Sequence, residues 1–362
     1  MRRLLTALAT TIAVAATAPV GAEGPLVKLG DPVPRDVRDI YDAGLRHLLK
    51  KQDASGAWQS QHGAPAPTAM ALMVLLASGE DPNFGPYRGP IRRAIRSLIN
   101  VQDGTVGYIG GEGGRPSMYH HGFAMLGLAE AYGVVDDRGL WTEPGAQGGK
   151  GQGRTIGQAL ELAVRAAVTA NKQNPTGGWH YGPEMPSADT SVSGAVLMGL
   201  LAARNSGIEV PDETIDRAIR YYVGMTGGNG NVGYSGGPGS GTDATTSIGV
   251  LVFSIARRQS LPQYKQAVTY LQQTSVGTAA AVNPMMRGRG NGSSYEHYYR
   301  AQALFQCNVQ AWEKWNNGFV KTLKAVQAKD GSFSMSYGPE VDTPLTLLAL
   351  AVNFKFLPVY ER

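Results

Sequence analysis

Internal repetition constrains this chain more than any other feature of its sequence. Apolar residues recur at i, i+3, i+4, i+7 and i+8, the spacing of an amphipathic helix, along three segments that begin at Ile91, Ile156 and Ile215. Weaker versions of the stripe begin at Ile40, Tyr264 and Trp315. Each is followed by a loop and then by a segment that is apolar nearly all round, which predicts a buried helix. The apolar segments begin at Thr68, Gly122, Ser193, Ile248, Ala301 and Leu345. We therefore expect an all-α chain of six pairs, each with an outer amphipathic helix and an inner buried helix.

Four of the connecting loops share a glutamine that precedes an aromatic residue by six positions, with glycine between them. The pairs are Gln52 and Trp58, Gln102 and Tyr108, Gln173 and Trp179, and Gln327 and Phe333. The glutamine can bond loop backbone at a helix end, glycine permits positive φ, and the aromatic ring packs against the next repeat. The spacing therefore predicts a structural staple between repeats.

Six such pairs resemble the prenyltransferase and squalene-oxidase repeat family, and the glutamine-to-aromatic spacing is similar to the QW-type motif of triterpene cyclases. The segments 119–130, 189–194 and 356–360 are similar to those of secreted bacterial members without a settled activity. The resemblance covers roughly residues 38–358. It implies one α/α toroid over residues 38–362, an (α/α)6 barrel, after an N-terminal extension at residues 23–37. Residues 136–155 contain six glycines and no apolar stripe, so we expect an insertion there.

The N-terminus has the pattern of an export signal. Arg2 and Arg3 precede an apolar stretch that ends near Ala18, and small residues stand at Val20 and Ala22. This pattern predicts a signal peptide over residues 1–22 and export to the periplasm or the extracellular space. The stretch is short for a membrane span, and no later segment is long and apolar enough to be one.

The predicted topology makes the inner helices parallel, so their N-termini should meet at one mouth of the toroid. Four residues placed there could carry catalysis: Asp189, Asp243, Asp342 and His297. Seven could contact a ligand: Tyr119, His120, His121, Trp179, Glu296, Tyr298 and Tyr299. A simpler interpretation exists for the three aspartates, because each stands where a helix N-cap belongs and Asp is a favoured cap.

The residues that carry the known chemistries of the resembling family are absent from this sequence. The relatives that protonate an alkene use an Asp-x-Asp-Asp cluster, whereas Asp189 and Asp243 are single acids. The zinc site of protein prenyltransferases does not carry over, because Cys307 lies near the end of the fifth inner segment with no adjacent Asp. We expect no cofactor. A divalent ion held by His297 with Asp189 or Asp243 stays an alternative, although no His-x-x-x-His spacing supports it.

Three functions stay open at this stage. The first is an exported toroid whose central apolar pocket binds or processes an isoprenoid or lipid-like molecule; if it is an enzyme, it would be terpenoid cyclase-like or prenyltransferase-like. The second is a non-enzymatic binding or scaffold protein. The third is a carbohydrate-active barrel that uses Asp189 with Asp243, or Glu296 with Asp342. The formal net charge is +5 without any basic stripe, which disfavours nucleic acid as a partner.

Overall fold

The computed structural model describes residues 33–110, 117–143, 145–146, 148–275, 292–354 and 357. The expected signal peptide and most of the N-terminal extension lie outside the described residues, as do most of segment 356–360 and residues 276–291. Val33–Arg362 forms one compact unit of the chain. In the part that is described, no helix is long and apolar enough to cross a membrane.

Twelve helices alternate between outer and inner positions through the described residues. The outer helices are α1 (Arg35–Lys51), α3 (Arg88–Asn100), α5 (Ile156–Gln173), α7 (Asp212–Met225), α9 (Pro262–Ser275) and α11 (Val309–Val326). The inner helices are α2 (Pro65–Leu76), α4 (Met118–Ala131), α6 (Thr190–Asn205), α8 (Asp243–Ile255), α10 (Ser294–Cys307) and α12 (Pro339–Ala351). The only β pairing in the described segments is two isolated bridges. The expectation of an all-α chain is confirmed.

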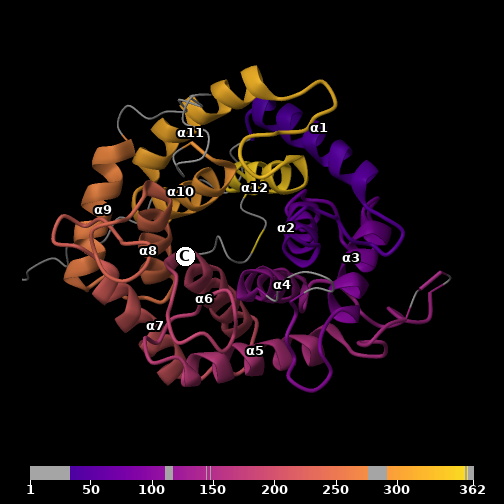
Figure 1. The fold of residues 1–362 in the computed structure, drawn as a ribbon. Helices are drawn as coiled ribbons and strands as arrows, with labels where there is room; N and C mark the ends of the chain where they lie inside the picture. The colour runs from indigo at the N-terminus through magenta and orange to yellow at the C-terminus, as the bar shows by residue number, and fades with distance from the viewer. Residues whose placement is uncertain are drawn as a thin grey trace, which may run out of the picture. The chain divides into compact units, whose positions relative to one another are not determined.

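The inner helices form a closed ring inside the outer helices (Figure 1). Each inner helix contacts the next one along the chain, and α12 returns to contact α2. The inner helices are buried over nearly their whole length, whereas α1, α3 and α7 bury one face and expose the other. This is the α/α toroid that the family resemblance implies, and the burial follows the alternation of amphipathic and uniformly apolar segments.

Glycines let α4 and α6 approach each other closely. A Cβ on Gly122 would lie 2.6 Å from the backbone carbon of Ala195, and one on Gly199 would lie 2.8 Å from the carbonyl oxygen of Gly122. Real Cβ atoms do not approach backbone so closely, so any larger side chain would force these two helices apart.

Glutamine side chains staple consecutive repeats, as the loop motif predicts. Gln102 is fully buried, and its amide donates to the carbonyl oxygens of Gly107 (3.0 Å) and Ala159 (2.8 Å). Gln52 and Gln327 make the same pair of bonds, one to the loop glycine and one to the next outer helix.

The third repeat is an exception to this pattern. Gln173 is exposed, and Asn171 donates to Gly177 in its place (2.6 Å). The motif is therefore correct for three repeats, but the prediction for Gln173 is wrong, because a shorter amide two residues earlier reaches the same carbonyl.

Candidate functional site

Contacts between neighbouring inner helices place their N-terminal ends along one rim of the ring. The Ala66 amide of α2 donates to His120 of α4, at 3.2 Å. The Met118 amide of α4 donates to the carbonyl of Tyr181 in the loop that precedes α6. The Thr190 amide of α6 likewise donates to Tyr234, in the loop that precedes α8. We call this end of the ring the N-terminal rim.

The contacts of α10 show which of its faces points to the ring centre. Ser294 bonds to α12, Arg300 bonds to α8, and His297 packs against Trp315 and Phe319 of the outer helix α11. At about 100° per residue, the remaining face carries Tyr295, Tyr298, Tyr299 and Gln302. That face points away from α11 and therefore toward the ring centre.

Aromatic side chains of opposite inner helices meet across the ring. The Tyr119 and Tyr295 rings of α4 and α10 have centroids 6.0 Å apart, and those of Phe123 and Tyr298 are 6.1 Å apart. Tyr299 joins the group through Tyr295 (4.9 Å) and Tyr298 (4.8 Å). We call these five residues the aromatic centre. They occupy the first two turns of α4 and α10, next to the N-terminal rim.

Burial keeps the phenols of the aromatic centre neutral. Loss of solvent raises the pKa of Tyr119, Tyr295 and Tyr299 well above the ordinary tyrosine value, and neighbouring phenols raise it further. The Tyr295 hydroxyl lies beside Tyr119 and Tyr299 but makes no aligned hydrogen bond. The centre is therefore an apolar wall with uncharged hydroxyl groups.

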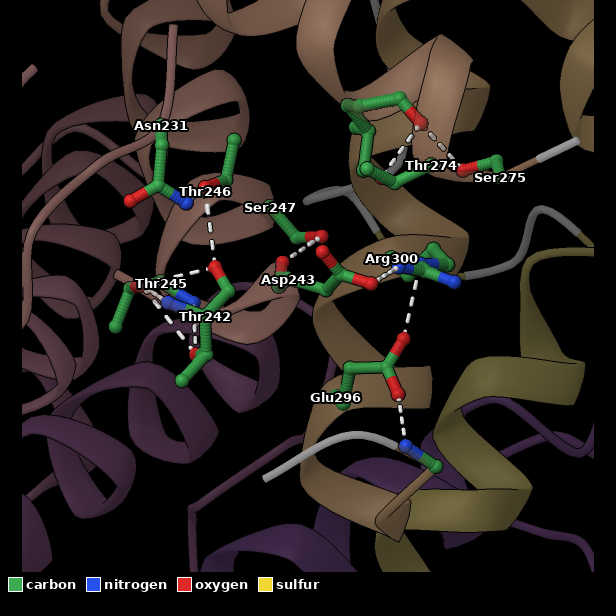
Figure 2. Close-up of polar contacts among 12 residues, drawn as sticks. Asn231, Thr242, Asp243, Thr245, Thr246, Ser247, Thr274, Ser275, Glu296 and Arg300 are labelled. Carbon is green, nitrogen blue, oxygen red and sulfur yellow. Dashed lines mark hydrogen bonds and ion pairs between the residues drawn. The ribbon is translucent and has the colours of Figure 1, made fainter. Parts of the chain in front are cut away.

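Two carboxylates of the predicted site share one arginine (Figure 2). Nη2 of Arg300 lies 2.6 Å from Oδ2 of Asp243, and Nε of Arg300 lies 2.9 Å from Oε1 of Glu296. The Glu296 and Arg300 side chains are almost fully buried. Burial raises the pKa of Glu296, and Arg300 partly offsets this. This cluster links α8 to α10.

The expectation that Asp243 is the N-cap of α8 is wrong, because Thr242 holds that position.

Asp342 is not an N-cap either, because Gly338 precedes α12. Its Oδ2 accepts from the amides of Met335 (2.7 Å), Ser336 (2.9 Å) and Tyr337 (3.0 Å), and its Oδ1 accepts from Ser294 of α10. The carboxylate thus shapes the loop before α12 and ties it to α10.

Asp189 is the N-cap of α6, as predicted. Its Oδ1 accepts from the Val192 amide (2.9 Å) and from the Ser191 hydroxyl, and the residue is buried. The capping interpretation accounts for these contacts.

The adjacent histidines act as links between repeats. His120 accepts from the Ala66 amide and donates to the His62 carbonyl (2.6 Å). His121 accepts from the Ile109 amide (3.1 Å) and donates to the Ala163 carbonyl (3.0 Å). Both nitrogens of both rings are occupied by backbone groups, so each ring is held in its neutral form.

The fully buried His121 makes stability depend on pH. Burial lowers the pKa of His121 to about 4, whereas an exposed histidine titrates near 6.5. Above about pH 6.5 neither state is protonated and the stability is intact. As the pH falls from about 6.5 to about 4, only the unfolded chain binds this proton, so the folded state loses stability. Urea unfolding at pH 7, 5.5 and 4.5 should show that the free energy of unfolding falls less with acidification in His121→Gln than in wild type.

Exposed His62 provides the control for this prediction. His62→Gln should lose as much unfolding free energy at acid pH as wild type, because the His62 side chain is exposed and folding does not bury it. An equal pH dependence in His121→Gln and wild type would contradict the assignment.

Trp179 and His297 also lie away from the ring centre. The Trp179 indole is buried and donates to the Ala167 carbonyl of α5 (2.9 Å). His297 faces α11, and burial lowers its pKa to about 3. Of the predicted site residues, the structure therefore brings Tyr119, Tyr298 and Tyr299 together, and places Asp243 with Glu296. Within the described residues, no three His, Cys, Asp or Glu side chains gather as a metal site would require.

Two inward-facing polar residues were missed at the sequence level. Glu130 lies seven residues after Phe123 and therefore on the same face of α4, and its charge acts on the Tyr298 phenol. Gln302 lies four residues after Tyr298, to which it is hydrogen bonded. The available signal was a carboxylate and an amide inside segments that are otherwise apolar.

The fold is an α/α toroid like that of a terpene cyclase of known structure. No family model and no curated protein matches the chain. Among solved structures, the type II terpene cyclase MstE from Scytonema is similar, with a TM-score of 0.60 and 15% identity over 90% of this chain and 100% of that one. A single-substitution variant of MstE in complex with the substrate geranylgeranyl dihydroxybenzoate is also similar, with a TM-score of 0.60 and 16% identity over 89% of this chain and 98% of that one.

A glycosidase has a similar fold. The GH76 α-mannanase of Bacteroides thetaiotaomicron has a TM-score of 0.54 and 12% identity over 88% of this chain and 96% of that one. At such low identities these likenesses establish the shared toroid fold. They fit the terpenoid cyclase-like toroid that the repeats resemble.

Proposed function

We propose that this chain binds an isoprenoid or similar lipid-like molecule at the centre of the toroid. The observation that carries the proposal is the aromatic centre, where Tyr119 and Phe123 of α4 meet Tyr295 and Tyr298 of α10. Neutral aromatic faces favour a long apolar chain through the hydrophobic effect. Because the rings touch, the chain lies beside this contact, along the apolar inner helices.

The shared fold supports the same proposal. MstE is a toroid of similar length that binds a geranylgeranyl compound. We also propose that residues 1–22 direct export of the chain, on the strength of their basic, apolar and small-residue pattern.

The arrangement of carboxylates favours a lipid over a carbohydrate. Glycosidases place two carboxyl groups on either side of the scissile bond. Asp189 and Asp342 are occupied by backbone amides, and Asp243 and Glu296 share Arg300. On the inward faces of α4 and α10, Glu130 is the one carboxylate.

We expect Phe123→Ser to weaken binding of a polyprenyl probe at least tenfold. The change removes an aromatic ring from the buried centre and leaves a polar hydroxyl in its place, so the apolar chain loses part of its contact area. Native mass spectrometry of the purified chain with geranylgeraniol measures the affinity, and thermal unfolding checks that the variant folds.

Phe84→Ser is the matched control, because Phe84 is 91% exposed and should bind the probe like wild type. Two results would contradict the proposal. One is that wild type carries no extracted lipid and binds no polyprenyl probe, which would favour a scaffold. The other is that a folded Phe123→Ser variant binds as tightly as wild type.

A further inference from the structure

The inward face of α10 holds a buried hydrogen-bond acceptor without a donor. Gln302 is 2% exposed, and its amide nitrogen donates to the backbone carbonyl of Tyr298 (3.1 Å). Its carbonyl oxygen, Oε1, is buried and accepts no aligned hydrogen bond. Leaving such an oxygen dry costs free energy, so a donor from a bound molecule would be stabilised there.

Contacts on the other faces of α10 fix the direction of Gln302. Four residues correspond to about 400° of helix rotation, so Gln302 lies within about 40° of Tyr298. The Tyr298 ring contacts Phe123 on the opposite side of the ring. Gln302 is therefore on the face that meets α4, one turn below the aromatic centre and farther from the N-terminal rim.

The charges of the inner helices disfavour an anionic ligand head at this position. These six described helices contain two arginines and no lysine. Arg204 pairs with Asp212 at the end of α6, and Arg300 lies between Asp243 and Glu296. The charge nearest to Tyr298 on the opposite helix is the carboxylate of Glu130. A diphosphate at this position would face the negative carboxylate of Glu130. Both arginines of the inner helices are already in ion pairs and would not be available to it.

We infer that the ligand is an isoprenoid with a neutral, hydrogen-bond-donating head, such as an alcohol, and that its hydroxyl donates to Oε1 of Gln302. The apolar chain then lies against the aromatic centre, and the head points to the end of the ring far from the N-terminal rim. This inference rests on the proposed function and specifies the ligand class of the same site.

Three probes of equal chain length test the inference on the full chain. They are geranylgeraniol, geranylgeranyl diphosphate and the corresponding hydrocarbon without a head group. We expect the alcohol to bind wild type at least tenfold more tightly than either of the others. Competition in native mass spectrometry measures the ratios directly.

Gln302→Leu removes the acceptor and should abolish the preference for the alcohol over the hydrocarbon, without weakening the hydrocarbon. Gln302→Met has a closer shape and serves as a second variant if the first unfolds. Gln310→Leu is the matched control, because Gln310 is exposed on α11 and should keep the preference.

The outcomes separate this inference from the proposed function. If none of the three probes binds, both fail. If the diphosphate or the hydrocarbon binds as tightly as the alcohol, the inference fails and the proposed apolar site stands. A folded Gln302 variant that keeps the wild-type preference would likewise overturn the role of Gln302.

Discussion

Replacing Arg300 with methionine is expected to lower the free energy of unfolding by about 3–5 kcal/mol. The change leaves Asp243 and the nearly fully buried Glu296 without the guanidinium that lies between them. Removing one partner of a buried ion pair costs far more than the pair contributes, because an uncompensated charge stays in the interior. Urea unfolding at pH 7 measures the loss.

The pH dependence of this variant identifies the cause. Burial already raises the pKa of Glu296, and loss of Arg300 should raise it further. A carboxyl whose pKa is higher in the folded chain than in the unfolded chain stabilises the fold at pH values below its unfolded-state pKa. This contribution is lost as the pH rises through the folded-state pKa. Acidification should therefore recover part of the loss in Arg300→Met, and Glu296→Gln should recover part of it at pH 7.

Arg204→Met is the control, because Arg204 pairs with the exposed Asp212 and should cost less than about 1 kcal/mol. If Arg300→Met and Arg204→Met cost the same, the cluster does not stabilise the contact between α8 and α10.

Asp342→Ala is expected to cost about 2–4 kcal/mol, the second largest effect. The substitution removes the acceptor of three consecutive backbone amides and of the Ser294 hydroxyl. These amides are then left unsatisfied in a partly buried loop. Chemical unfolding measures the loss, and near-UV circular dichroism reports whether Tyr337 keeps its packing.

Glu340→Ala tests the simpler capping interpretation, since Glu340 stands in the same first turn of α12. The same helix dipole acts on Glu340, but Glu340 makes none of the hydrogen bonds that Asp342 makes. We expect a cost below about 1 kcal/mol. Equal costs for the two variants would mean that Asp342 acts only through the helix dipole.

The pairing of helices was predictable because it depends on local periodicity. A stripe at i, i+3, i+4 and i+7 buries one face, and an all-apolar segment buries every face, so their alternation predicts outer and inner helices; the ring was implied by the family resemblance. The local half of each staple was predictable for the same reason, since Gln52, Gln102 and Gln327 each donate to a loop glycine four or five residues ahead. The prediction for Gln173 failed because Asn171, two residues earlier, donates to the backbone carbonyl of the loop glycine Gly177 instead.

The identity of the site residues was less predictable, because it depends on which face of each inner helix points inward. An inner helix is buried on all faces, so its sequence has no stripe that marks the inward one. His121 and His297 consequently looked like site residues, although they face the outer helices. Glu130 and Gln302 were overlooked, although they face the centre.

The sequence by itself determined the number of helices, their alternation and the local glutamine-to-glycine bonds of the loops, since these follow from hydrophobic period and turn chemistry within one repeat. Only the tertiary structure decided which polar groups meet. Arg300 finds Asp243, and Asp342 finds Ser294, because ring closure brings them together from separate repeats across 57 and 48 residues. The aromatic centre has the same origin: α4 and α10 are opposite members of a closed ring, and nothing local in either helix encodes its partner.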